Sequence, residues 1–129
     1  MAQSSQRPLS PHLSIWRWGL AMLISILHRA TGDGMAVVGG VILVGWFLAI
    51  AGGPESYEFY TGLLTSPIGY IILVGLSWSF FQHMCSGLRH FVLDAGAGFE
   101  VERNNRWSAM LPIISTILTA LFWAVILLV

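Results

Sequence analysis

Residues 61–88 read TGLLTSPIGYIILVGLSWSFFQHMCSGL, without a single Asp, Glu, Lys or Arg. A helix needs about 20 residues, each rising 1.5 Å, to cross a hydrocarbon core of about 30 Å. Two further stretches, residues 34–53 and 107–129, are also uncharged. Across the 129 residues, 56% are hydrophobic and 9% are charged, whereas roughly a quarter are charged in soluble domains. The sequence therefore predicts an all-α membrane protein with three transmembrane helices.

Glycine and proline mark the predicted helix ends within a single domain. Gly52-Gly53-Pro54 stops the first helix, because glycine favours a helix end and proline cannot continue one. Ser66-Pro67 starts the second helix, because proline is tolerated in a first turn. The expected layout is an N-terminal segment over residues 1–18, then helices over about 19–52, 66–93 and 107–129.

The charged residues predict an orientation. All six basic residues are arginines: Arg7, Arg17 and Arg29 precede the first uncharged stretch, and Arg89, Arg103 and Arg106 bracket the second loop. The first loop carries Glu55 and Glu58 and no basic residue. By the positive-inside rule, the N-terminus and the second loop face the cytoplasm or matrix.

Composition also excludes several classes of function. The net charge is zero, and no clustered basic face points to nucleic-acid binding. The N-terminal segment opens polar and lacks a small-residue cleavage site, so it is not expected to be a signal peptide. The single cysteine, Cys85, excludes an internal disulfide and Cys-ligated metal clusters, and is expected to be a packing residue.

Two histidines lie on one stripe of the second predicted helix. At 100° per residue, His90 lies about 20° from His83, and Gly87 about 40° from it. His83 is about 9 Å deeper along the axis than Arg89, where polar groups usually face a bundle interior. A b-type haem requires such an imidazole on its axial-ligand helix, and a glycine one turn away lets the flat ring approach. His83 is therefore the predicted iron ligand.

This chain can supply only one axial ligand. His83 and His90 lie on the same face about 10.5 Å apart, whereas two axial ligands approach an iron from opposite sides. His12 lies in the N-terminal segment and His28 nearer the basic side. A bis-histidine iron would thus need a ligand from a partner chain. Alternatively, His83 is an interhelical hydrogen-bond donor or part of a proton relay.

The first predicted helix carries a second polar cluster. Ser25 and Arg29 are i,i+4 neighbours, and His28 is i+3 from Ser25. Arg29 and His28 could hold haem propionates, while Ser25 and Arg29 could hydrogen-bond a quinone carbonyl. A cationic donor stabilises the charge that develops on a carbonyl gaining electrons. Arg29 could instead mark topology or snorkel to the surface.

Further charged residues border this region. Arg89 and His90 reach the same membrane level as Arg29, so two cationic clusters are expected to frame one pocket. Asp94 either accepts a hydrogen bond from His90 or is a solvated residue at the helix end. Asp33 is expected to form a salt bridge to a partner, with a proton pathway as the alternative.

With these motifs in place, the sequence resembles the cytochrome b subunit of succinate dehydrogenase, the succinate:ubiquinone oxidoreductase of respiratory complex II. The resemblance rests on three segments: residues 7–13 (RPLSPHL), residues 25–32 (SILHRATG) and the pattern His83-x-x-x-Gly87-x-Arg89-His90-x-x-x-Asp94. They follow the family's order and its three-helix layout. Asp33-Gly34 departs from the family, in which apolar residues are expected.

The resemblance implies a role for each polar group. His83 would be the axial ligand of haem b, with His28, Arg29 and His90 near the propionates. Ser25 and Arg29 would lie at the ubiquinone site. No residue of this chain would act on succinate, although the whole complex is an oxidoreductase of electron transport and the tricarboxylic acid cycle.

The resemblance also implies partners. The three helices would form half of a membrane anchor bundle in the lipid, and a second small haem-binding anchor subunit would supply the other iron ligand. An iron–sulfur subunit would lie near the quinone site, and a flavoprotein subunit would oxidise succinate. The N-terminal motif resembles the alphaproteobacterial and mitochondrial branch. Because no transit-peptide-like extension precedes it, a bacterial inner membrane is expected, with the mitochondrial inner membrane as the alternative.

Two other functions remain open at this level. The chain could be a haemless structural anchor whose histidines only pack or hydrogen-bond. It could also be an unrelated small three-helix transporter or assembly protein, in which Asp33, His83 and His90 form an ion path.

Overall fold

The computed structural model describes residue 10 and residues 12–128, and this part of the chain is helical without any strand. Three helices are long and apolar enough to cross a membrane, which confirms the predicted all-α architecture: Leu20–Ala51, Pro67–Asp94 and Val101–Leu128. In chain order the elements are α1 (Leu20–Gly34), η2 (Met35–Gly39), α2 (Gly40–Ala51), α3 (Pro54–Leu64), α4 (Pro67–Asp94) and α5 (Val101–Leu128). Residues 1–9, 11 and 129, which include Arg7 and most of the RPLSPHL segment, lie outside the described residues.

The first long helix contains a feature that the sequence did not predict. α1 continues through the π-helical turn η2 into α2 without a break. A π turn inserts an extra residue, so the residues that follow are rotated relative to those before it. Ser25, His28 and Arg29 lie on α1, before the π turn. After the π turn, α2 packs against α3.

Glycine and proline end the helices where the sequence predicted. α2 ends before Gly53, whose φ of 89° lies in the left-handed region that favours glycine. Pro54 then occupies the first turn of a short helix, α3, within the segment expected to be a loop. Ser66 caps α4 by accepting a hydrogen bond from the Gly69 amide at 3.1 Å.

Tyr60 holds α3 against α2. Its hydroxyl donates to the main-chain carbonyl of Ile42 at 2.7 Å, and a Cβ atom at Gly45 would lie 2.7 Å from the same hydroxyl oxygen. Close packing is therefore the role of Gly45. At Gly40 and Gly75, in contrast, an added Cβ would meet nothing within 4 Å.

The last helix begins earlier than its uncharged stretch indicated. α5 starts at Val101, whereas the sequence placed the start near Trp107. Its first turns carry an exposed ion pair between Arg106 and Glu102 at i,i+4, and pairs of this spacing stabilise exposed helix. Charged turns extend the helix beyond the segment that is apolar enough for lipid.

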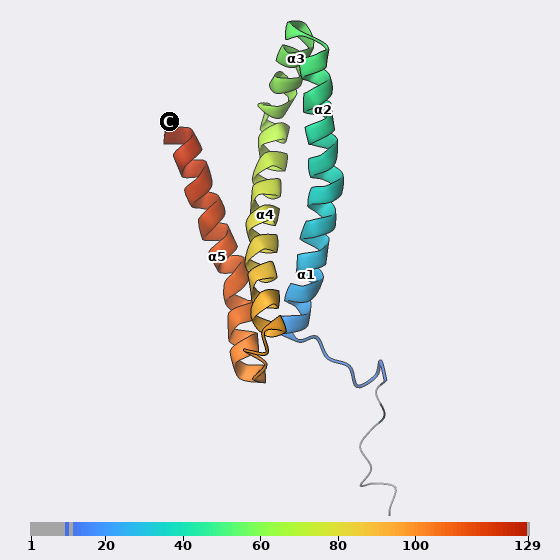
Figure 1. Ribbon diagram of the computed structural model, residues 1–129, viewed down its shortest axis with the longest axis vertical. Helices are drawn as coiled ribbons and strands as arrows, with labels where there is room; N and C mark the ends of the chain where they lie inside the picture. Colours follow the sequence, from blue (N-terminus) through green and yellow to red (C-terminus); the bar gives the residue numbers. More distant parts are fainter. Residues whose placement is uncertain (1–9, 11, 129) are drawn as a thin grey trace, which may run out of the picture.

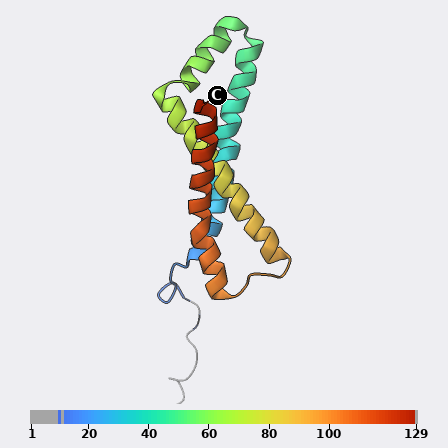
Figure 2. The same cartoon turned by 90° about the vertical axis from the view of Figure 1, so that its left-hand side faces the viewer.

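The burial pattern is the reverse of that in a soluble helical bundle: polar side chains are buried and large apolar side chains are exposed. α4 lies between α1 and α5 (Figure 1) and runs obliquely across α5 (Figure 2). The fully buried side chains are polar or small: Gln82, Ser86, Ser108 and Ser115. Large apolar side chains point outward along all three long helices. Such small-residue contacts are expected in lipid, which provides no hydrophobic drive between helices.

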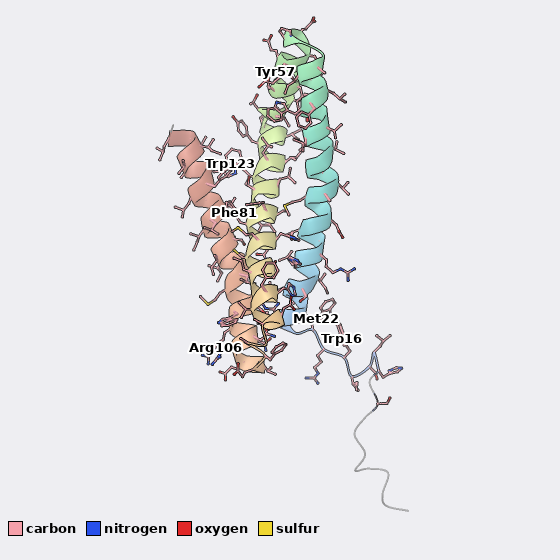
Figure 3. The ribbon with its side chains drawn as sticks, in the orientation of Figure 1. Trp16, Met22, Tyr57, Phe81, Arg106 and Trp123 are labelled. Atoms are coloured by element: carbon pink, nitrogen blue, oxygen red, sulfur yellow. The ribbon has the colours of Figure 1, made fainter. Side chains whose placement is uncertain are left out.

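The two ends of the bundle differ in charge. The start of α1 and the loop between α4 and α5 lie at one end, whereas α3 and the end of α5 lie at the other (Figure 1). Arg106 is at the first end and Tyr57 of α3 is at the second (Figure 3). Glu55 and Glu58 belong to α3. This separation matches the predicted charge pattern; which end faces the cytoplasm stays a prediction.

Candidate functional site

His83 points from α4 toward α1, where the main chain holds its ring. Its Nδ1 lies 2.9 Å from the main-chain carbonyl oxygen of His28. A carbonyl oxygen can only accept, so Nδ1 carries the proton and Nε2 of the neutral ring keeps its lone pair. No hydrogen bond involves Nε2 within the described residues. The ring thus offers one free metal-ligating nitrogen, oriented as ligating histidines usually are.

Gly32 of α1 makes room for this ring. A Cβ atom at Gly32 would lie 2.7 Å from Cε1 and 3.1 Å from Nδ1 of His83. The first distance is shorter than Cβ atoms in proteins show, so the ring and a side chain at position 32 could not keep these positions together. The sequence had singled out Gly87 as the glycine that leaves room for a flat ring. A Cβ at Gly87 would make only an ordinary contact, 3.6 Å from Cε1 of His28.

His28 brings three imidazoles together. Its ring stacks on that of His83 with centroids 3.9 Å apart and planes at 12°. The ring of His90 lies 5.0 Å from that of His28 at 57°. On its other side, His28 Nδ1 is 2.8 Å from the hydroxyl of Ser86. The structure therefore unites His83, His90 and His28 across the contact between α1 and α4.

Ser25 and Arg29 border this cluster on α1. The Ser25 hydroxyl donates to the main-chain carbonyl of Ala21 at 3.1 Å, and its side chain is half-buried. Arg29 is exposed and forms no hydrogen bond or ion pair within the described residues. Toward the described residues, the guanidinium group uses none of its donors.

Arg89 corrects the expected pocket. It is 6% exposed and points to α5, where Nε and Nη2 donate to Asn104 Oδ1 at 3.1 and 2.6 Å. Consecutive helical residues differ by about 100°, so His90 faces α1 while Arg89 faces α5. Only His90 joins His28, and the two predicted cationic clusters do not frame one pocket.

Asp94 and Asp33 are both exposed, which bears on the alternatives left open for each. Asp94 is exposed at the end of α4 and makes no hydrogen bond with His90, which favours its reading as a residue at the helix end. Asp33 is also exposed, on α1, and has no ion-pair partner within the described part of the chain. A carboxylate inside a span is costly unless another protein surface covers it.

Two contributors were missed at the sequence level. Gly32 was read only as part of the SILHRATG motif, and Ser86 only as a spacer between His83 and Gly87. Ser86 lies one turn from His83, which was the available signal. The contact to His28 of another helix could not be read from that spacing.

The cluster can act as a donor set for a ligand that brings its own metal. Within the described residues, no three His, Cys, Asp or Glu side chains are placed to hold a bare metal ion. One anchored imidazole with a free Nε2, surrounded by cationic or neutral donors, instead fits an iron already held by a macrocycle.

Comparison with known proteins identifies the family. Residues 3–122 match the model of the succinate dehydrogenase/fumarate reductase transmembrane subunit family. The chain belongs to this family. A succinate dehydrogenase cytochrome b556 subunit from Paracoccus denitrificans is 40% identical over 116 residues, covering 89% of this chain and 88% of the relative. The corresponding subunit of Rickettsia felis is 34% identical, with 92% of each chain covered.

Similarity extends to a mitochondrial protein. The mouse succinate dehydrogenase cytochrome b560 subunit is 41% identical over 101 residues, covering 76% of this chain and 59% of the relative. The predicted resemblance to the cytochrome b anchor of succinate dehydrogenase is therefore confirmed at the level of the family. Together with its three spanning helices, membership makes this chain a multi-pass transmembrane subunit of an oxidoreductase complex.

Proposed function

We propose that this transmembrane subunit holds haem b through His83, shares it with a second subunit, and helps to form the site where ubiquinone is reduced. The observation that supports this proposal most directly is the hydrogen bond from His83 Nδ1 to the His28 carbonyl. In the neutral ring it makes Nε2 the nitrogen that keeps its lone pair, and it orients the ring, as the second hydrogen bond of a metal-ligating histidine does.

The optical spectrum of the purified complex tests the haem assignment. Oxidised and dithionite-reduced samples should differ by the bands of a b-type haem. Absence of these bands would favour a haemless anchor, in which His28 and His83 only pack and hydrogen-bond between α1 and α4.

The other polar groups are assigned by their place around His83. His28 and His90, whose ring centroids are 5.0 Å apart, would lie near the propionates. The guanidinium of Arg29, which has no partner within the described residues, would donate to them. Charge-assisted bonds from arginine to carboxylates are strong and often bidentate. Haem b supplies a one-electron carrier when bound; the protein contributes ligation, orientation and a cationic environment.

Gly32 provides a first prediction for this site. Gly32→Ala places a methyl group 2.7 Å from His83 Cε1, so the imidazole must shift and haem retention should weaken about tenfold. Gly34→Ala is the matched control, because a Cβ there meets nothing within 4 Å. Haem-to-protein ratio after detergent dilution measures the difference. Equal ratios for both variants would contradict the assigned role of Gly32.

Ser25 and Arg29 are proposed to bind the quinone. Both lie on α1, which starts at the end of the bundle where Arg106 lies (Figures 1 and 3). Arg29 has no partner within the described residues, and Ser25 can turn its hydroxyl from the Ala21 carbonyl to a ligand. A cationic donor beside a quinone carbonyl stabilises the charge gained on reduction.

Partner subunits are proposed to cover the exposed face of α1. Arg29 and Asp33 are charged, exposed and one turn apart inside a predicted span, and such groups usually face protein or water rather than lipid. A second small anchor subunit would pair with Asp33 and supply the other iron ligand. An iron–sulfur subunit would adjoin the quinone site and bind the flavoprotein that oxidises succinate.

Orientation in the membrane provides a second prediction. We propose a bacterial inner membrane, with the arginine-rich end of the bundle in the cytoplasm. In a Cys85→Ala background, a cysteine replacing Glu55 should react with a membrane-impermeant maleimide in spheroplasts. One replacing Ser14 should react only in inverted vesicles. The opposite labelling pattern would show that the orientation is reversed.

A further inference from the structure

The geometry points to Ser86 as a positioning residue of the haem site: its hydroxyl holds the His28 ring, against which the ring of His83 stacks. This inference rests on the proposed haem ligation by His83. It assigns a role to a residue that belongs to neither polar cluster identified in the sequence.

The Ser86 hydroxyl donates its proton to a main-chain carbonyl of its own helix, α4. Ser86 is fully buried, and its Oγ lies 2.6 Å from the carbonyl oxygen of Gln82 and 3.1 Å from that of His83. A hydroxyl carries one proton, and both of these neighbours can only accept. Its lone pair therefore faces His28, whose Nδ1 at 2.8 Å must be the donor. Nε2 is then the only nitrogen of His28 left to meet a bound molecule.

The contacts form a closed path between two helices. His83 Nδ1 donates to the His28 carbonyl, the two rings stack at 3.9 Å, and His28 Nδ1 donates back to Ser86 on α4. Within the described residues, the bonds to His83 and Ser86 are the only side-chain hydrogen bonds that link α1 with α4. Without the Ser86 hydroxyl, the His28 ring can rotate and the face of His83 loses its support.

Ser108 offers a matched control. It is also fully buried and also donates to a carbonyl four residues earlier, that of Asn104, at 2.7 Å. It makes no contact with a histidine ring through its hydroxyl. Ser108→Ala removes an equivalent hydroxyl from the same bundle, so any general effect of losing a buried serine appears in this variant.

The experiment compares the complete complex carrying Ser86→Ala, Ser86→Cys or Ser108→Ala with the unmodified complex. Cysteine keeps a γ atom in the place of the hydroxyl, with a larger sulfur, but is a weak hydrogen-bond donor and acceptor. The measurements are the rate of haem transfer to excess apomyoglobin and the low-spin iron resonance. Both Ser86 variants should lose haem about tenfold faster and give a broadened resonance, while Ser108→Ala matches the unmodified complex.

Three other outcomes would overturn the inference that Ser86 positions His28, each for a different reason. Normal behaviour of Ser86→Cys with fast loss from Ser86→Ala would show that Ser86 fills space rather than bonding to His28. Equal rates for all complexes would show that it has no positioning role. Absence of haem from the unmodified complex would overturn the proposed ligation by His83 as well.

Discussion

Replacing His83 with alanine should abolish the low-spin b-type spectrum of the complex and reduce its haem content at least tenfold. His83 is the only histidine whose Nδ1 is anchored to a main-chain carbonyl while Nε2 stays free within the described residues. Removal of even an outer hydrogen-bonding partner costs about 10- to 100-fold in metal affinity, and loss of the ligand itself should cost no less. Reduced-minus-oxidised spectra and a haem assay measure the effect.

His90→Ala is the control for this prediction. His90 is also half-buried on α4 and also close to His28, but it lies about 10.5 Å from His83 along the helix. It should keep the axial ligation and change only the contacts to the propionates. If His90→Ala abolished the spectrum and His83→Ala left it unchanged, the ligand assignment would be wrong. Co-purification of the other subunits shows that each variant assembles.

Replacing Arg29 with alanine should lower succinate–quinone reductase activity about 10²-fold. The basis is the free guanidinium, which has no partner within the described residues and is proposed to donate to the quinone carbonyl. Loss of one such donor to a developing oxyanion typically costs about 10²- to 10³-fold in kcat. Succinate oxidation with an artificial acceptor should persist, because that reaction does not need the quinone site.

Two variants sharpen the interpretation of this loss. Arg29→Lys keeps the charge but not the planar fork of donors, so it should restore only part of the activity. Arg17→Ala removes an exposed arginine before α1 and should leave both activities unchanged. Equal loss of quinone reduction and artificial-acceptor activity in Arg29→Ala would instead mean that the complex failed to assemble.

The tight contact between α1 and α4 explains why the prediction for His83 concerns two helices at once. Gly32 and His28 of α1 shape the position of His83, which belongs to α4. A change on either helix therefore reaches the same imidazole. Under the proposed ligation by His83, this chain would fill one axial position, and a bis-histidine iron would need its other ligand from a second subunit.

The number of long helices and most of their ends could be predicted from the sequence because they follow local rules. The start of α5 at Val101 was the exception. Residues 61–88 are uncharged, and only a helix that satisfies its own backbone hydrogen bonds can place such a stretch in lipid. Gly53 and Pro54 end one helix and begin the next for reasons of backbone conformation. The π turn η2 and the short helix α3 were missed, because neither changes the hydropathy of the chain.

The arrangement of the site could be predicted only in part from the sequence. The stripe of His83 and His90 follows from helical periodicity alone. Arg89 shows the limit of that reasoning, since it is adjacent to His90 on α4 and yet points to Asn104 of α5. The position of a residue along its helix axis follows from the sequence. The side chain that it contacts on another helix depends on how the two helices pack.

The sequence by itself determined that this protein has three helices able to cross a membrane and that His83 and His90 share one stripe of the second. Both conclusions depend on hydropathy and on the 3.6-residue period, which are local properties. Only the tertiary structure decided that Gly32 admits the His83 ring, that the His28 carbonyl fixes its protonated nitrogen, and that Ser86 holds His28. These contacts join residues more than 50 positions apart, and no local pattern records which faces of two helices meet.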